Sequence, residues 1–132
     1  MNLRFLRNYP ISPSQVAQLL DASGIKRPTD DLARIEKMYA EANLIISAWD
    51  GERLVGIARA LSDFSYCCYL SDLAVDTAYQ KHGIGKALVE QIQVANGPQV
   101  SLILLSASEA MDYYGKLGFD TINNGFIMRR QS

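Results

Sequence analysis

The chain has 132 residues, of which 48% are hydrophobic and 20% are charged, and its formal net charge is −1. A chain of this length can bury one ordinary core, and its composition is typical of a globular protein rather than a disordered one. Because positive charge is not in excess, we expect neither nucleic acid nor an anionic membrane as a partner. The sequence therefore predicts a single domain over residues 1–132.

The N-terminal segment and the cysteines favour the same cellular setting. Arg4 and Arg7 interrupt the apolar residues of the segment, so we expect neither a signal peptide nor a membrane span there. Cys67 and Cys68 are adjacent, and adjacent side chains of a strand face opposite ways, so no disulfide between them is expected. These features predict a reducing, cytoplasmic location, and two cysteines with one histidine predict no metal site.

The first half of the chain predicts one strand, two helices and a β-hairpin. Ser12 followed by Pro13 is typical of a helix N-terminus, and Gly24 is typical of a helix end. The segment Asp50-Gly51-Glu52 separates two runs rich in apolar residues, which indicates a hairpin. In chain order, the predicted elements cover residues 3–8, 13–23, 32–42, 43–49 and 53–61.

The second half predicts alternating strands and helices. Residues 100–107 are nearly all apolar, which predicts a central strand with both faces covered. The predicted elements here are strands over residues 66–75 and 100–107, helices over residues 84–96 and 108–117, and a terminal hairpin over residues 119–122 and 126–130. Together the elements predict a mixed α/β sheet in the order β-α-α-β-β-β-α-β-α-β-β.

Two glycines, Gly83 and Gly85, stand where the helix over residues 84–96 should begin. A helix N-terminus carries unpaired N–H groups and a partial positive charge, and glycine leaves room for an anion to approach them. Lys81 and Lys86 add positive charge beside the two glycines. This loop is therefore predicted to bind a pyrophosphate.

Two common phosphate-binding loops fit the sequence poorly. The dinucleotide fingerprint needs a third glycine where Leu88 stands. A P-loop needs a glycine at the position of Gln80 and a Ser or Thr at the position of Ala87. A nucleotide-binding protein of either class is therefore disfavoured.

The stretch LSDLAVDTAYQKHGIGKALVE closely resembles the acetyl-CoA signature of the GNAT acetyltransferase superfamily. That signature is a strand ending in Leu-Ala-Val, followed by Q/R-x-x-G-x-G/A at the start of a helix. A second signature of the family, Tyr-x-x-x-Gly-Phe, is matched within DYYGKLGF, residues 112–119. On these two motifs in the right order, the chain is identified as a small, single-domain member of the superfamily.

The resemblance implies a GNAT fold with acetyl-CoA between two splayed central strands, here those ending at Val75 and Ala107. It also implies a bulge in the first of these strands. The cofactor-binding residues that it implies are Leu73, Ala74 and Val75 for the pantetheine arm, and Gln80, Lys81, His82, Gly83, Ile84, Gly85 and Lys86 for the pyrophosphate.

The activity implied is acetyl-CoA-dependent N-acetyl transfer directly to a primary amine. Tyr114, the tyrosine of the second signature, would give a proton to the departing CoA thiolate, whereas Tyr113 is expected to belong to the core. The Glu base that some members of the family carry has no counterpart here. Asp63, Asp72 and Glu109 are candidates by proximity in sequence, and a water chain is the alternative.

The sequence specifies neither the acceptor amine nor the oligomeric state. A small polyamine-like metabolite and a peptide or lysine amine both fit, and Ser108 stands where many members have an Asn contact. A non-catalytic acyl-CoA-binding sensor or subunit is the alternative function, and the resemblance also admits a homodimer. The candidates for attracting a cationic amine or forming an aromatic wall are Asp30, Asp31, Asp50, Glu52, Asp63, Trp49, Phe64 and Tyr66.

Overall fold

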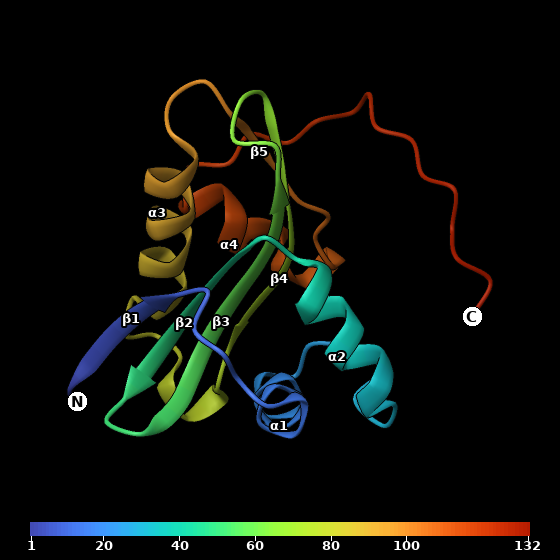
Figure 1. Cartoon of the computed structure of the whole chain (residues 1–132). Helices are drawn as coiled ribbons and strands as arrows, with labels where there is room; N and C mark the ends of the chain where they lie inside the picture. Colours follow the sequence, from blue (N-terminus) through green and yellow to red (C-terminus); the bar gives the residue numbers. More distant parts are fainter.

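The computed structural model describes all 132 residues as a five-stranded sheet with helices on both faces (Figure 1). The strands lie in the order β1-β2-β3-β4-β5; β1 to β4 are antiparallel, and β5 is parallel to β4. The predicted mixed α/β fold is confirmed. In chain order the elements are β1 (Leu3–Arg7), α1 (Pro13–Ser23), α2 (Leu32–Glu41), β2 (Leu44–Asp50), β3 (Arg53–Ser62), β4 (Cys67–Val75), η1 (Thr77–Tyr79), α3 (Ile84–Asn96), β5 (Ser101–Ile103), η2 (Ser108–Ala110) and α4 (Met111–Lys116).

Local capping sets the ends of the first two helices. The Ser12 hydroxyl accepts a hydrogen bond from the Gln15 N–H, and Gly24 ends α1 with a φ of 83°. The Asp31 carboxylate accepts from the Arg34 N–H at the start of α2. The cap signals of α1 depend only on nearby residues and predicted its ends, whereas α2 was predicted from the spacing of its apolar residues.

The core lies on both faces of the sheet. On one face, α3 packs through Leu88 and Ile92, which are fully buried. On the other face, α1 and α2 pack through Leu20 and Ile35, which are fully buried as well (Figure 1). The sheet is thereby held between two apolar layers, and the carboxyl ends of β4 and β5 stay accessible between them.

The C-terminal part of the chain differs from the prediction. The strand expected over residues 100–107 is shortened to β5, which is an edge strand rather than a central one. The terminal hairpin over residues 119–122 and 126–130 does not form, and residues 120–132 make no backbone–backbone hydrogen bond. A two-stranded hairpin is stable only when it adds to a sheet or packs on a helix, and this segment pairs with no strand.

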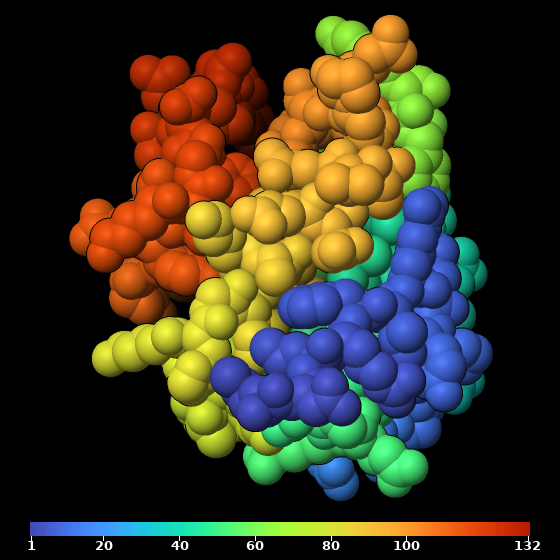
Figure 2. Space-filling model, turned by 90° about the vertical axis from the view of Figure 1, so that its left-hand side faces the viewer, coloured from blue at the N-terminus to red at the C-terminus, as the bar shows by residue number.

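The apolar side chains of this tail lie in solvent. Phe126 and Met128 are 101% and 99% exposed, and Ile122 and Ile127 are more than half exposed. Figure 2 shows the last residues, in red, separated by a hollow from the orange surface at the end of α3 and β5. The tail therefore leaves the edge of β5 uncovered.

Candidate functional site

The largest described cleft opens where β4 and β5 separate. The two strands pair in parallel only as far as Tyr69 and Ile103. Beyond these residues lies a cleft of about 1010 Å³, lined on one side by β4 from Leu70 to Val75. The other side is formed by the chain after β5 and by α4. The predicted splay of the two strands is thus present.

A bulge in β4 forms part of the cleft wall. Arg59 of β3 pairs with Asp72 while Ala60 pairs with Leu70, so Ser71 has no partner on β3. Such a bulge bends a strand and re-aims its backbone groups. Ser71 lines the cleft, just beyond the point where β4 loses β5 as its neighbour. The bulge implied by the family resemblance is therefore observed.

The edge of β4 that faces the cleft has free backbone hydrogen-bonding groups. Leu73, Ala74 and Val75 pair with β3 on one side and have no strand partner on the other. All three residues line the cleft. The Gln80 side-chain amide donates to the Val75 carbonyl at 3.0 Å, which fixes the following loop to the end of the strand. An extended ligand can therefore hydrogen-bond to this edge as an added strand would.

The loop before α3 has the properties of an anion site. Gly83 adopts a φ of 77° ahead of α3, and no side chain caps the helix. The first N–H groups of α3 therefore have no protein partner. Lys81 and Lys86 are exposed beside them. All the predicted loop residues line the cleft except His82, which is exposed and lies outside the lining.

Tyr113 lies at this loop, so the expectation that it belongs to the core is wrong. Its side chain is 43% exposed and lines the cleft. A Cβ atom added to Gly85 would overlap the Tyr113 hydroxyl. Consecutive helix residues point about 100° apart, so two neighbours at the edge of α4 can both face the cleft. The sequence signal for this contact is the motif glycine itself, which leaves the space that Tyr113 uses.

Tyr114 lines the same cleft and is partly buried. Its ring makes edge-on contacts with Tyr113 and Phe119, at centroid distances of 5.4 and 5.8 Å. Burial raises the pKa of Tyr114, and the charge of Tyr113 raises it further, while Arg27 acts in the opposite direction. Tyr114 is therefore protonated at neutral pH, as a proton donor must be.

A buried group of charged and polar residues lies behind Ser71. We call it the Asp72 cluster, and it consists of Asp72, Arg27, Arg59 and Tyr39. The Asp72 carboxylate is fully buried and accepts from Arg27 Nε and Arg59 Nε at 2.7 Å each and from the Tyr39 hydroxyl at 2.8 Å. Burial raises the pKa of Asp72, but the two guanidinium groups outweigh this effect and hold it below the ordinary value.

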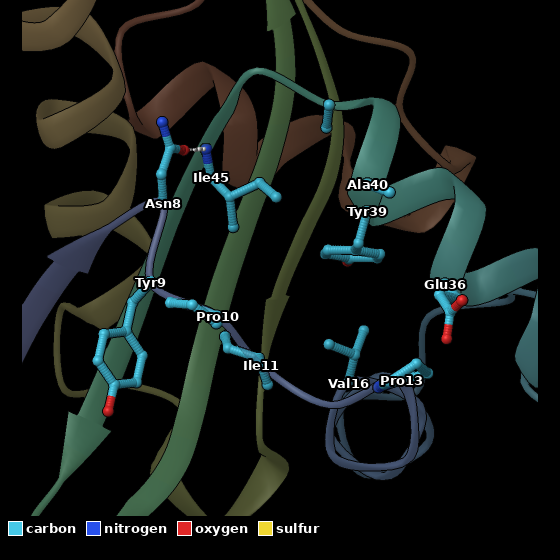
Figure 3. A pocket seen from close by; sticks show the side chains of 11 residues that line it. Asn8, Tyr9, Pro10, Ile11, Pro13, Val16, Glu36, Tyr39, Ala40 and Ile45 are labelled. Carbon is cyan, nitrogen blue, oxygen red and sulfur yellow. Dashed lines mark hydrogen bonds between the residues drawn. The ribbon is translucent and has the colours of Figure 1, made fainter.

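Tyr39 joins the Asp72 cluster to a second, smaller cavity. This cavity of about 310 Å³ lies among the segment after β1, α1, α2 and β2, and Figure 3 shows the Tyr39 ring on its wall. Its lining contains one carboxylate, Glu36, and no lysine or arginine. Burial, together with the neighbouring Asp72 carboxylate, raises the pKa of Tyr39, so its hydroxyl is a permanent donor.

The carboxylates expected near the acceptor lie elsewhere, with one exception. Asp72 is enclosed in its cluster, and Asp63 caps a turn by accepting three backbone N–H groups, which lowers its pKa to about 2. Glu109 is the single carboxylate that lines the cleft. None of the other proposed acceptor residues lines it, namely Asp30, Asp31, Asp50, Glu52, Trp49, Phe64 and Tyr66.

The structure also bears on the cysteines, on metal binding and on membrane-spanning helices. Both cysteines are free thiols. No three His, Cys, Asp or Glu side chains lie close enough together to hold a metal ion. No helix has the length and apolar character needed to cross a membrane.

Comparison with known proteins assigns the family. The profile of the family described as "Acetyltransferase (GNAT) domain" matches residues 17–129. The chain belongs to the GNAT acetyltransferase family. The uncharacterized N-acetyltransferase ycf52 of Pyropia yezoensis is 32% identical over 119 residues, which are 85% of this chain and 67% of that protein. The chain spans about a third of the length of curated plant acetyltransferases from Glycine max and Arabidopsis thaliana.

Solved structures show the GNAT fold. A probable acetyltransferase of unknown function from methicillin-resistant Staphylococcus aureus has a TM-score of 0.81 at 21% identity, covering 97% of this chain and 99% of that one. The aminoglycoside N-acetyltransferase AAC(6')-Iy, solved in complex with CoA, has a TM-score of 0.75 at 16% identity, covering 99% and 96%. Both structural alignments extend over nearly the whole of this chain.

Proposed function

We propose that the protein is an acetyl-CoA-dependent N-acetyltransferase that acts directly on a primary amine. The observation that carries this proposal is the meeting of three features in one cleft. These are the free edge of β4, the uncapped N-terminus of α3, and the protonated hydroxyl of Tyr114. Residues 1–132 would act as one domain.

The residues present fit acetyl-CoA. The unpaired N–H groups at the start of α3 suit a pyrophosphate, and Lys81 and Lys86 add charge to the site. The backbone of Leu73, Ala74 and Val75 suits the amide groups of a pantetheine arm. A thioester at the far end of that arm would lie near the bulge at Ser71, where a re-aimed backbone group can bind its carbonyl oxygen.

The acetyl-CoA cosubstrate supplies an acyl group on a good leaving group. In the proposed reaction the amine nitrogen bonds to the acetyl carbon and the carbon–sulfur bond breaks. Tyr114 gives its proton to the thiolate and regains, through solvent, the proton that the nitrogen releases as the amide forms. The incoming ammonium must first lose another proton to become a nucleophile. Glu109, the cleft's single carboxylate, is our candidate for receiving that proton, directly or through water.

Thiol release from acetyl-CoA with a panel of amines tests the proposal. We expect Tyr114→Phe to lower kcat by about 10²-fold or more, the usual contribution of a positioned proton donor, with acetyl-CoA affinity unchanged. Tyr66→Phe is a matched control, because Tyr66 is 78% exposed and lies outside the cleft. If acetyl-CoA binds but no amine raises turnover above hydrolysis, the protein is an acyl-CoA-binding sensor or subunit instead.

We also propose that the protein forms a homodimer through its C-terminal tail. Residues 120–132 make no backbone–backbone hydrogen bond, and Phe126 and Met128, two positions apart, expose their side chains completely. The same chain leaves the edge of β5 unpaired, with Ile103 and Leu105 exposed beside it. A second copy supplies the missing partner for both surfaces, because the tail of one chain can add to β5 of the other.

Sedimentation analysis of the parent and of the double variant Phe126→Asp with Met128→Asp tests the dimer. The parent should sediment as a dimer and the variant as a folded monomer, since charge cannot be buried at the added strand. Tyr66→Asp, a charge at another largely exposed aromatic residue outside the tail, should leave the dimer intact. A monomeric parent at high concentration would refute this assembly.

A cytoplasmic location stays a prediction. Relatives from Arabidopsis thaliana are described as chloroplastic, which makes an organelle the competing location. Fractionation of cells that express the tagged protein distinguishes the two.

A further inference from the structure

The cleft has a second basic region, distant from the phosphate loop. Lys26 and Arg27, on the loop between α1 and α2, line the cleft together with Ser71. Ser71 lies four residues before Val75 along β4, which is a separation of about 13 Å in a strand. Lys81 and Lys86 therefore serve one end of the cleft, and Lys26 and Arg27 serve the other.

The Asp72 cluster carries one more positive than negative charge. It holds two guanidinium groups, Arg27 and Arg59, and one carboxylate, Asp72, whose two oxygens are both occupied by these groups and by Tyr39. Neither guanidinium forms an ion pair with a second carboxylate. The Arg59 side chain is 9% exposed and the Arg27 side chain 27%, so the surplus charge reaches solvent through Arg27.

Arg27 is held in position by three different acceptors. Its Nε donates to Asp72, its Nη2 donates to the Ser71 carbonyl at 2.6 Å, and its Nη1 donates to the Lys26 carbonyl at 2.6 Å. Each Nη atom has one further N–H group to offer. A guanidinium fixed in this way loses little side-chain entropy when it binds an anion, and its geometry suits carboxylate and phosphate groups.

We propose that the acceptor amine also carries an anionic group, a carboxylate or a phosphate, which binds to Lys26 and Arg27. This inference rests on the proposed function, because it specifies the amine that the same cleft would acetylate. Glu109, which lines the same cleft, attracts the ammonium end of such a molecule before its proton is lost. A polyamine has no anionic group for Lys26 and Arg27 and is repelled by both, so the polyamine alternative is disfavoured.

Matched pairs of amines test the charge requirement. We compare amino acids with their amides, phosphoethanolamine with ethanolamine, and both sets with spermidine, measuring kcat/KM from thiol release. The anionic member of at least one pair should exceed its neutral partner by about 10-fold or more, the effect of one hydrogen-bonded charge pair. The two pairs distinguish a carboxylate from a phosphate as the preferred anion.

A charge reversal at the exposed Lys26 tests whether the preference for anionic amines depends on this residue. Lys26→Glu should reduce the preference for the anionic amine to about 2-fold or less and leave acetyl-CoA affinity unchanged. Lys37→Glu is the matched control, since Lys37 is also exposed and lies outside the cleft lining. It should keep the full preference.

Two results would overturn the inference. If acetyl-CoA binds and neutral amines or spermidine are acetylated as well as the anionic amines, the inference fails while the proposed function stands. If acetyl-CoA produces neither binding heat nor a melting shift, the proposed function fails, and the inference fails with it.

Discussion

The two ends of the cleft both carry positive charge, but they are built in different ways. At the α3 end, the charge comes from main-chain N–H groups and from exposed lysines within residues 80–86, a short continuous segment. At the other end, it comes from the exposed Lys26 and from Arg27, whose guanidinium is held on the buried Asp72 carboxylate in a cluster built from four elements or loops. The first end is a local structure, and the second exists only when the whole fold has formed.

This difference determines how each end responds to substitution. A change at Lys81 or Lys86 removes a charge from the proposed phosphate site and leaves the core intact, because both side chains are exposed. A change in the Asp72 cluster disturbs the packing of α2, β3 and β4 on one another, because each supplies a member. Measurements of ligand affinity and of unfolding free energy on single variants separate these two kinds of effect.

Asp72→Asn should have the largest effect on stability. The substitution leaves Arg27 and Arg59 close together without their shared negative charge, and loss of one partner from a buried ion pair costs about 3–5 kcal/mol. Urea unfolding of the parent and variant measures the loss. Asp63→Asn is the control, because Asp63 also has a lowered pKa but lies at an exposed turn, so its loss should be much smaller.

Lowering the pH should reduce the free energy of unfolding of the parent more than that of the Asp72→Asn variant. The folded-state pKa of Asp72 lies below its unfolded value of about 4, so its ionised form stabilises the fold above that pH. This contribution is lost as the pH falls through the folded-state pKa. The unfolding free energies of the two proteins should therefore converge below about pH 4, and parallel curves between pH 7 and pH 3 would contradict the role given to Asp72.

The sequence correctly predicted where α3 begins, because that boundary depends on neighbouring residues such as Gly83. Pyrophosphate binding at this helix N-terminus stays a prediction. The Asp72 cluster could not be found this way. Its place in the sequence makes Asp72 a candidate base, but Arg27 lies 45 residues away from it along the chain, and nothing local indicates that the two meet.

The C-terminal tail shows the same limit. Its apolar residues predict strands, but they do not specify which edge such a strand pairs with. The hairpin prediction assumed a partner within the same chain. The bulge at Ser71 was likewise implied only by the family resemblance, because a one-residue insertion in a strand leaves no mark in the apolar pattern.

At the α3 end, substitution of Gly85 should reduce ligand affinity with little loss of stability. Gly85→Val places a side chain over the first turn of α3 and should weaken acetyl-CoA binding by roughly 1–3 kcal/mol, because polar groups are left unpaired. Isothermal calorimetry with acetyl-CoA measures the change. Unchanged binding heat would show that the pyrophosphate lies elsewhere.

The contact between Gly85 and Tyr113 calls for a second comparison at this position. An added Cβ would displace the Tyr113 hydroxyl, so Gly85→Ala alone could weaken binding through the tyrosine rather than through the phosphate. Gly85→Ala combined with Tyr113→Phe removes the overlapping hydroxyl. If the double variant regains affinity, Tyr113 causes the loss; if it does not, the loss comes from blocked access to the N–H groups of α3.

The smallest effect is expected from the exposed lysines of the same loop. Lys81→Ala and Lys86→Ala should each weaken acetyl-CoA binding only about 2- to 5-fold, because an exposed charge pair is worth little in water. The loss should shrink further as the salt concentration rises, whereas the loss caused by Gly85→Val should not, since main-chain hydrogen bonds are screened far less. Calorimetric titrations with acetyl-CoA at low and high salt measure the affinity losses of the lysine variants and of Gly85→Val. If a lysine variant instead abolished binding at every salt concentration, the pyrophosphate would depend on side-chain charge, and the two ends of the cleft would work by the same means.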